Sequence, residues 1–419
     1  IAPFLELDQD PYPILRDGRV QYIVDAYTTT SNYPYAQSVN AAEVSAGTSG
    51  TFNYIRNSAK ALVDGYDGTV TLYLTDELYG GQTDPIIQAY AQAFPGLFTS
   101  KIPDSVKQHF RYPEFMFKTQ TVAWGRYHQT DPSTFFNNSD RWVVAQQPSD
   151  RGAGAVQADT SSGASAEAQT AIDPYYQELK IGSAETAQFV LTRPFVLSSG
   201  DGTGRNLTSV MIARNDPDNY GKLEEIVMVI SADGKTERNN SVDGPVQANR
   251  KMVTYGPVTE YQTLTGQIGS TMRYGNILIL PQGDSLVYMR PIYVAQEDST
   301  RFTVKKVVMV SGDAVGFGDS VEQALADLVD SKPDGAAFIP SVTVPSTNPD
   351  PGNSSTTVPS GEERTATELI TQADQKFTEA DERLKASDLA GYAALVAEAR
   401  TLIAQASEKL SAEGATAKP

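Results

Sequence analysis

Residues 52–77, FNYIRNSAKALVDGYDGTVTLYLTDE, are the stretch around which the rest of the chain is interpreted. Its second part, VTLYL at 70–74, alternates apolar and polar side chains with the period of two that is typical of a half-buried strand. The first part, 54–64, alternates less cleanly, and the Asp-Gly pair at 67–68 suits the positive φ angles of a hairpin turn. We predict a β-hairpin with an exposed polar face; a helix over residues 55–63 is the alternative.

The remainder of the chain mixes strands and helices without a strict strand-helix-strand rhythm. Strands are predicted at 20–27, 189–195, 207–214, 223–230, 277–280, 286–294 and 304–310. Helices are predicted after Thr83 or Asp84, at 119–128, within 246–254 and 258–267, and at 319–329 behind Asp319 or Ser320 as the capping residue. This order predicts an α+β fold with mixed, mostly antiparallel sheets and interspersed helices.

Composition divides the chain into five expected parts. Residues 1–147 and 173–330 are expected to be N-terminal and C-terminal α+β subdomains, joined by an Ala/Ser/Gly-rich flexible loop at 148–172. Residues 331–361 are too rich in Pro, Ser and Thr for a packed element and predict an extended linker. Residues 362–412 carry apolar residues at three- and four-residue spacing on two segments, which predicts a helical hairpin. That hairpin could dock on the main body or mediate self-association.

Charge and residue usage exclude several classes of protein. With 33 basic against 51 acidic residues the net charge is −18, which disfavours nucleic-acid binding. The absence of cysteine removes disulfides, thiolate catalysis and zinc ribbons. No apolar run reaches the length of a membrane-spanning helix. Because the chain begins at Ile1 without a Met or a signal-peptide pattern, we expect it to be cut from a longer protein.

The search for catalytic chemistry finds no recognisable motif. His109 and His128 are the two histidines, each among aromatic residues, and we interpret both as structural. Nucleophile-elbow, His-Glu-x-x-His and phosphate-binding glycine motifs are missing. Carboxylate pairs of glycoside hydrolases follow no local spacing rule, so the sequence leaves them open. No catalytic, cofactor-binding or metal-binding residue is predicted.

Two acidic stretches were weighed as cation sites. Asp216, Asp218 and Asn219 cluster before a strand, but an Asx-turn loop is the favoured interpretation. Asp8, Asp10 and Asp17 lack the spacing of a calcium loop, and turn or cap carboxylates are expected there. The sequence does not decide whether Asp216 and Asp218 bind a cation.

A series of short motifs in a fixed order resembles the UPF0182 family of bacterial integral membrane proteins, over about residues 1–330. The motifs are Ala2-Pro-Phe-Leu-Glu-Leu-Asp, Asp10-Pro-Tyr-Pro, Asp17-Gly-Arg, Asp25-Ala-Tyr-Thr-Thr, Tyr33-Pro-Tyr, Asn53-Tyr-Ile-Arg-Asn-Ser, Tyr66-Asp-Gly-Thr-Val, Asp84-Pro-Ile, Phe94-Pro-Gly-Leu-Phe, Arg111-Tyr-Pro-Glu, Arg126-Tyr-His, Thr130-Asp-Pro, Tyr220-Gly-Lys-Leu, Gly275-Asn-Ile-Leu-Ile-Leu-Pro, Pro291-Ile-Tyr-Val and Phe317-Gly-Asp.

This resemblance implies a location. Members of the family look like proteins with several N-terminal transmembrane helices and a large domain on the outer face of the cell membrane, and this chain would be that extracytoplasmic domain. Some actinobacterial members are encoded beside a PDZ-containing membrane protease, which implies an envelope membrane-protein partner. The family brings no catalytic residues to carry over.

Three functions follow as hypotheses. The first is a non-enzymatic assembly or binding platform in the cell envelope, with self-association through the C-terminal hairpin. The second is a carrier or transport-associated domain for an apolar envelope component, motivated by 21 Tyr and 15 Phe residues. The third is an envelope hydrolase, whose histidine-dependent forms require His109 or His128 in a cleft.

Overall fold

A computed structural model describes most of the chain up to residue 343. The described residues are 1–44, 50–82, 84–152, 171–181, 186–198, 206–232, 235–239, 241–267, 270–282, 285–296, 301–331, 342–343 and single residues between 372 and 398. The chain divides into the units Ile1–Thr347 and Asn348–Pro419, and the fold below is that of the first. Most of the predicted hairpin at 362–412 and most of the segments 148–172 and 331–361 lie outside the described residues, so the expected domain boundaries stay predictions.

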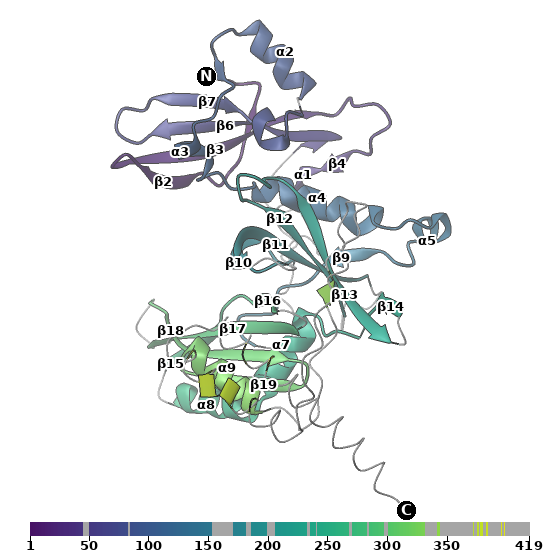
Figure 1. Ribbon diagram of the computed structural model, residues 1–419, viewed down its shortest axis with the longest axis vertical. Coiled ribbons are helices and arrows are strands. Elements are labelled where there is room, and N and C mark those ends of the chain that lie inside the picture. The colour runs from purple at the N-terminus through teal and green to yellow at the C-terminus, as the bar shows by residue number, and fades with distance from the viewer. Residues whose placement is uncertain are drawn as a thin grey trace, which may run out of the picture. The chain divides into compact units, whose positions relative to one another are not determined.

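The first sheet is built around the predicted hairpin (Figure 1). Strand β6 (Tyr54–Asp64) pairs antiparallel with β7 (Val70–Leu74), which confirms the strand over the helix for this segment. Gly68 in the connecting turn has a φ of 72°, as the Asp-Gly pair predicted. The sheet order is β1-β3-β6-β7-β8, with β2 also on β3. Its other strands are β1 (Glu6–Leu7), β2 (Tyr12–Arg16), β3 (Arg19–Thr30) and β8 (Phe98–Thr99), of which β8 runs parallel to β7.

The expectation that the hairpin has an exposed polar face is wrong. Residues 57–62 of β6 are all buried, and Lys60 is 0% exposed. One face packs with helix α2 (Pro85–Ala93) through Ile87, and the other faces the segment around Phe110. Because both covers come from segments distant in sequence, the local alternation of the hairpin could not reveal them. The polar side chains of β6 are therefore part of the interior.

The second sheet is joined to the first by a shared hydrophobic core. Its order is β10-β11-β12-β13-β14, with β9 on β11 and β20 on β13. The strands are β9 (Trp142–Val144), β10 (Tyr175–Leu179), β11 (Gln188–Leu197), β12 (Leu207–Arg214), β13 (Leu223–Ala232), β14 (Lys235–Arg238) and β20 (Val342–Thr343). Trp142, Leu191 and Phe195 of this sheet pack in one cluster with Ile23 and Leu62 of the first. Helix α4 (Glu114–Tyr127) contacts β9, β11 and β6.

The third sheet packs against the second and carries helices on its surface (Figure 1). Its order is β15-β17-β18-β19 with β16 on β17, and the strands are β15 (Ser270–Tyr274), β16 (Leu278–Gln282), β17 (Ser285–Gln296), β18 (Thr303–Ser311) and β19 (Ala314–Gly318). The predicted helices here are confirmed as α7 (Pro245–Thr254), α8 (Gly256–Gln267) and α9 (Val321–Asp330). The Ser320 hydroxyl caps α9 by accepting from Gln323 N at 3.3 Å.

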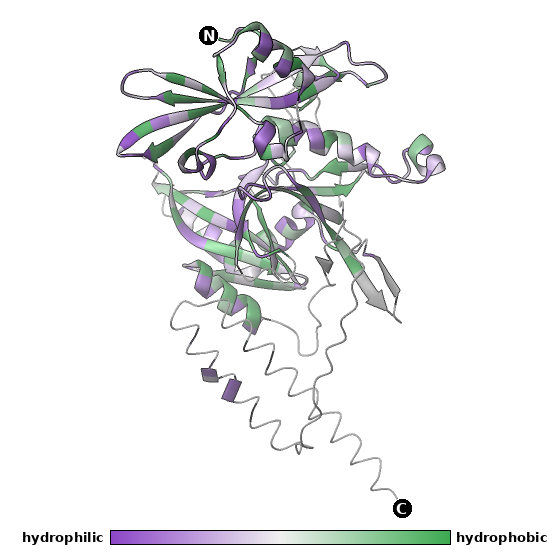
Figure 2. Cartoon of the chain, turned by 45° about the horizontal axis from the view of Figure 1, so that its top comes forward, coloured by the Kyte–Doolittle hydropathy of each residue, from purple (hydrophilic) through white to green (hydrophobic). Residues whose placement is uncertain are grey.

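Short elements complete the unit. They are β4 (Val39–Asn40), which pairs with β5 (Thr51–Phe52), α1 (Ala41–Val44), the 3-10 helix η1 (Asp76–Tyr79), α3 (Asp104–Lys107) and α5 (Pro132–Asn137). Figure 2 shows hydrophobic and hydrophilic residues alternating along the strands of the first sheet. The α+β class and its mostly antiparallel sheets are confirmed. Within the described residues, no helix combines the length and the apolar character needed to cross a bilayer.

Candidate binding site around Arg111

A buried ion pair lies beneath the candidate site. The register of the first sheet places Asp25 on β3 directly opposite Lys60 on β6, and the Lys60 ammonium donates to Asp25 Oδ1. Asn57 Nδ2 donates to the same oxygen at 3.0 Å. Burial lowers the pKa of Lys60 and raises the pKa of Asp25, so desolvation opposes both charges while their mutual attraction sustains them. The pair is a fixed polar centre in an otherwise apolar layer.

Lys60 of this ion pair also binds the backbone of Arg111. Lys60 Nζ donates to the Arg111 carbonyl at 2.9 Å, and the Tyr220 hydroxyl donates to the same oxygen at 2.8 Å. The Arg111 N–H donates to the Tyr12 hydroxyl at 3.0 Å. Both polar groups of this loop residue are thus bound by side chains from β6, β2 and the loop before β13, although no regular element contains it.

The next residue is held in the same way. The Tyr112 N–H donates to Asn215 Oδ1 at 2.6 Å, and its carbonyl accepts from the Tyr176 hydroxyl at 2.7 Å. The Tyr112 ring is 1% exposed, and its hydroxyl donates to Gln120 on α4 at 2.7 Å. Loops with saturated backbone groups and buried neighbours have little freedom to open. Residues 111–112 therefore form a rigid support.

This support presents the Arg111 side chain between two aromatic rings. The guanidinium carbon lies 4.8 Å from the ring centre of Tyr12 and 5.4 Å from that of Tyr176. Burial raises the pKa of both tyrosines, so both rings stay neutral and offer their π faces to the cation. Within the described part of the chain the guanidinium makes no hydrogen bond and no ion pair. Its five N–H donors are positioned but uncommitted.

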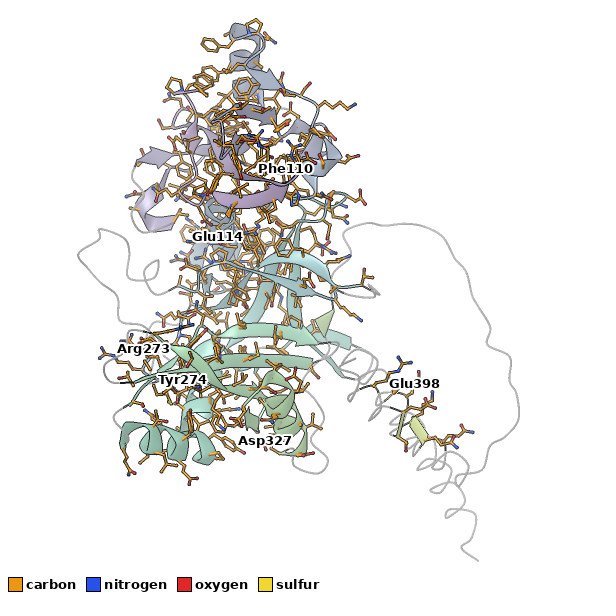
Figure 3. The ribbon with its side chains drawn as sticks, turned by 90° about the vertical axis from the view of Figure 1, so that its left-hand side faces the viewer. Phe110, Glu114, Arg273, Tyr274, Asp327 and Glu398 are labelled. Atoms are coloured by element: carbon orange, nitrogen blue, oxygen red, sulfur yellow. The ribbon has the colours of Figure 1, made fainter. Side chains whose placement is uncertain are left out.

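Arg111 borders a pocket of about 510 Å³, a size typical of small-molecule sites. The wall residues come from β2, from the segment after α3, from β11 and from the loop after β12: Pro13, Ile14, Leu15, Gln108, His109, Phe110, Arg111, Phe189, Asn215, Asp216 and Pro217. In Figure 3, Phe110 lies among the closely packed side chains beside the first sheet, and Glu114 marks the start of α4 below it. The walls combine apolar side chains with one cation and one acid.

The acid in the pocket is Asp216. Its Oδ2 atom is buried and accepts no hydrogen bond from the described residues. Asp216 and Arg111 form no ion pair with each other, although they border the same cavity. The pocket wall therefore carries one cation and one acid that are not paired with each other. Such a site is complementary to a ligand that carries both an anionic group and a donor.

The structure separates the two histidines. The His128 side chain is 3% exposed, and its ring stacks on Trp142 with 3.7 Å between centres, so it lies in the packed interior. His109 borders the pocket instead, where its Nε2 lies 3.5 Å from Gln108 Nε2. A relay of the serine-hydrolase type needs an imidazole oriented by a carboxylate, and the described residues place none in hydrogen-bond contact with His109.

The acidic stretches weighed as cation sites are turns. Asp8 Oδ1 accepts from the Asp10 N–H at 2.9 Å, and Asp8 Oδ2 accepts from the Tyr27 hydroxyl, which confirms turn and cap carboxylates. In the loop after β12, the Asn219 N–H donates to the Asp216 backbone carbonyl at 3.0 Å, which forms a backbone turn, whereas Asp216 Oδ2 accepts no hydrogen bond from the described residues, so the expected Asx turn is not formed by this atom. No group of three His, Asp or Glu side chains that could hold a metal ion occurs among the described residues.

Sequence reasoning missed the residues at the centre of this site. Arg111, Tyr12, Tyr176 and Lys60 were assigned no function from the sequence. The one local signal is the run His109-Phe110-Arg111-Tyr112, in which a cation is flanked by aromatic residues. The partners that fix it are distant in sequence, so their contribution follows from the fold alone.

Comparisons with known proteins show which family the chain belongs to. The model of the uncharacterised protein family UPF0182 matches residues 1–265. A UPF0182 protein of Methanospirillum hungatei is 35% identical over 328 residues, covering 78% of this chain and 32% of the relative. One from Saccharopolyspora erythraea is 35% identical over 336 residues, covering 78% and 32%. The chain belongs to the UPF0182 family. No solved structure matches it.

The matched region contains the whole Arg111 pocket, whose wall residues fall between Pro13 and Pro217. A further UPF0182 protein, from Pelotomaculum thermopropionicum, is 30% identical over 413 residues, which is 98% of this chain and 39% of that protein. The chain thus spans about a third of the length of these relatives. The activity of the complete UPF0182 protein is therefore a matter for proposal.

Proposed function

We propose that this chain is the extracytoplasmic part of a UPF0182 membrane protein and that it acts in the cell envelope as a non-enzymatic binding and assembly platform. The observation that carries the binding role is the uncommitted guanidinium of Arg111, clamped between Tyr12 and Tyr176 at the edge of a pocket. Membrane attachment rests on the family resemblance and on the length of the relatives outside this region.

The geometry favours binding over catalysis. A preorganised cation on a rigid loop lowers the entropy cost of ligand capture, because its side chain is already held in one place. Hydrolysis by a histidine would need His109 to activate a nucleophile or water, with a third group orienting the ring. In the described pocket the near neighbour of His109 Nε2 is an amide nitrogen. An envelope hydrolase therefore ranks below a binding platform.

An aromatic surface on α4 and α5 supports the assembly role. Phe136 is 84% exposed, Tyr127 is 54% exposed and Trp124 is 37% exposed. Aromatic side chains are enriched at protein interfaces, where they bury a large area with few rotatable bonds. If this surface contacts an envelope partner, the substitution Phe136→Ser is expected to weaken that complex in detergent extracts and to leave the melting temperature of the chain unchanged.

The proposed location can be tested by cysteine labelling, because this chain contains no cysteine. Glu260→Cys, at an exposed position of α8, is introduced into the full-length protein in its own cells, which are then treated with a membrane-impermeant maleimide. We expect labelling in intact cells. Ala248→Cys, at a position of α7 that is 0% exposed, is the matched control and should label only after unfolding. Glu260→Cys that labels only after cell lysis would contradict an extracytoplasmic location.

A carrier for an apolar envelope component is the second candidate. The observation that favours it is the apolar part of the pocket wall, where Ile14, Phe110 and Phe189 face one cavity. Native mass spectrometry of the full-length protein, extracted gently from its own membrane, separates the two functions. A reproducible extra mass that matches a lipid or glycan supports the carrier. A clean multiple of the subunit mass, or a complex with a second protein, supports the platform.

A further inference from the structure

We propose that the Arg111 pocket binds an apolar α-amino carboxylate, either as a free amino acid or as the terminus of a peptide. This inference deepens the proposed binding role and depends on it, whereas it is independent of the cellular location. It follows from three features of the pocket: the form of the cation, the position of the acid and the nature of the wall between them.

The cation suits a carboxylate. A guanidinium presents parallel N–H donors in a plane, a geometry that matches the two oxygens of a carboxylate. Contacts with the rings of Tyr12 and Tyr176, whose centres lie 4.8 and 5.4 Å from the guanidinium carbon, hold the cation in place before any ligand arrives. Because Lys60, Tyr220 and Tyr12 already occupy the backbone groups of Arg111, the side chain is the part of this residue that remains available to a ligand.

The acid suits an ammonium group or an N–H group. A buried carboxylate oxygen without a donor is costly, and Asp216 Oδ2 is in that state within the described structure. Asp216 also borders the pocket, so a ligand ammonium group bound there would pair with its carboxylate charge. An anion without a donor, such as inorganic sulfate, would make no such pair and would face repulsion from the Asp216 charge.

The wall between the two charges suits an apolar side chain. Ile14, Phe110, Phe189 and Pro217 line the pocket. A ligand side chain packed there would be stabilised by the removal of its apolar surface from water. A glycine-like ligand would lack this contribution. The three features together describe an α-amino acid with an aliphatic or aromatic side chain.

The test uses the intact chain and a set of leucine derivatives in an NMR titration. L-leucine carries both charges, leucinamide lacks the carboxylate, and N-acetyl-leucine lacks the ammonium group. The readout is the chemical shifts of the Arg111 Nε–H and of the side-chain amides of Gln108 and Asn215, followed up to about 10 mM ligand, where a millimolar site is mostly filled. Leucylleucine and its amide extend the test to a peptide carboxyl terminus.

We expect L-leucine to bind at least about tenfold more tightly than leucinamide, the effect of losing one charge-assisted hydrogen-bonded pair. Arg111→Gln should abolish the preference for the carboxylate. If the ligand is a free amino acid, Asp216→Asn should abolish the preference for the free ammonium over the acetylated form, whose amide N–H resembles that of a peptide terminus. Protein substitutions and ligand changes together form a double-mutant cycle. Each substitution should remove the effect of changing one ligand group and should leave the effect of changing the other group intact. Leucylleucine that binds more tightly than leucine would identify the peptide terminus as the source, and the reverse order would identify the free amino acid.

Several outcomes would overturn the inference. Equal binding of leucine and leucinamide by the unsubstituted protein would show that the pocket does not recognise the carboxylate. This result does not depend on whether the variants fold. Inorganic sulfate that binds as tightly as leucine would show a simple anion site. The absence of any shift from leucine and its peptides would contradict this inference alone, because cysteine labelling tests the location separately and a bound lipid would support the carrier.

Discussion

At the scale of single residues, the arrangement depends on Lys60 and Asp25. The pair is sealed from solvent, with Lys60 at 0% and Asp25 at 4% exposure, and Lys60 also supports the Arg111 carbonyl. Buried ion pairs contribute little net stability, but the removal of one partner leaves the other charge uncompensated. The value of the pair therefore lies in fixing the loop that carries Arg111.

Loss of the lysine charge is expected to be costly. Lys60→Met should lower the free energy of unfolding by about 3–5 kcal/mol, because Asp25 would remain buried without its cation. Urea denaturation measures this change. Lys107→Met is the matched control: Lys107 pairs with Glu77 near the surface at 3.2 Å, and its loss should cost less than about 1 kcal/mol. Equal effects of the two substitutions would contradict the account of the buried pair.

Asp84 provides a second residue-scale prediction. Its carboxylate accepts from the Ser58 hydroxyl at 2.6 Å and from the Tyr54 hydroxyl at 2.7 Å, and it caps α2 by accepting from the Ile86 N–H. Asp84→Ala should cost about 2–4 kcal/mol, since it removes a helix cap and leaves buried donors unpaired. Asp131→Ala, which removes the exposed cap of α5, is the control and should cost less. A larger loss for Asp131→Ala would refute this ranking.

The same carboxylate predicts a pH dependence. Burial raises the pKa of Asp84, but hydrogen bonds from Ser58, Thr28 and Tyr54 outweigh burial and hold the pKa below its usual value. A carboxyl group with a lowered pKa stabilises the fold above its unfolded pKa, about 3.9, and this contribution fades as the pH falls through the folded value. The stability difference between the unsubstituted chain and Asp84→Asn should therefore shrink below about pH 4, as followed by denaturation from pH 7 downward. A difference that grows on acidification would reverse the assigned sign.

The sequence predicts the roles of some residues and not of others, and the difference has a physical reason. Asp84 was predicted as a cap because its role depends on Pro85 and the next turn of the same helix. Arg111 was missed because its role depends on Tyr12, Lys60 and Tyr176, which the fold brings from separate elements. Local chemistry is visible in a single sequence, whereas convergence of distant side chains is not.

At the scale of elements, close contact between α4 and β9 controls how the first and second sheets join. Gly125 lies on the buried face of α4, and a Cβ atom at this position would lie 2.5 Å from the Trp142 carbonyl oxygen on β9. Glycine is normally unfavourable inside a helix, so its presence here is explained by the space that the strand occupies.

Two alanine substitutions test this contact. Gly125→Ala should destabilise the chain, because the backbone of β9 or α4 would have to shift. Gly266→Ala, in α8, is the control: a Cβ atom there meets no atom within 4 Å, and the substitution should be neutral or stabilising by up to about 1 kcal/mol. Thermal unfolding of both variants measures the difference. Gly125→Ala that stabilises as Gly266→Ala does would show that α4 and β9 are not in close contact.

The elements themselves were largely predictable. Strands with strong alternation or continuous apolar runs, such as β7 and β18, and helices with clear caps, such as α2 and α9, were placed near their observed bounds. The burial of the hairpin could not be predicted, because β6 is covered by α2 on one face and by the Phe110 segment on the other. Alternation indicates that a strand has two chemically different faces and says nothing of what covers each face.

At the scale of the whole molecule, the three sheets of the described unit are joined by shared cores. One cluster links the first and second sheets through Ile23, Trp142 and Phe195, and another links the second and third through Val210, Ile279 and Tyr288. The Arg111 pocket lies where β2, the loop at 108–112 and the end of β12 meet, so it depends on the junction of the first two sheets.

Self-association belongs to this scale and remains a prediction from the sequence of 362–412. If the apolar seams of that segment join subunits, Phe377→Asp combined with Ile403→Asp should lower the particle mass measured by light scattering, because charges in a helical seam oppose pairing. Gln375→Asp combined with Gln405→Asp, which adds the same two charges outside the predicted seams, is the control. An unchanged particle mass in both double variants would show that the hairpin does not join the subunits.

The most direct test of the central claim, a rigid loop that presents Arg111, is amide hydrogen exchange at residues 111 and 112. The Arg111 and Tyr112 N–H groups are donated to the Tyr12 hydroxyl and to Asn215 Oδ1. We predict protection close to that of the amides of β6, with selective loss at Tyr112 in Asn215→Ala. Exchange as fast as at the exposed turn of Asp17 and Gly18 would contradict a preorganised site.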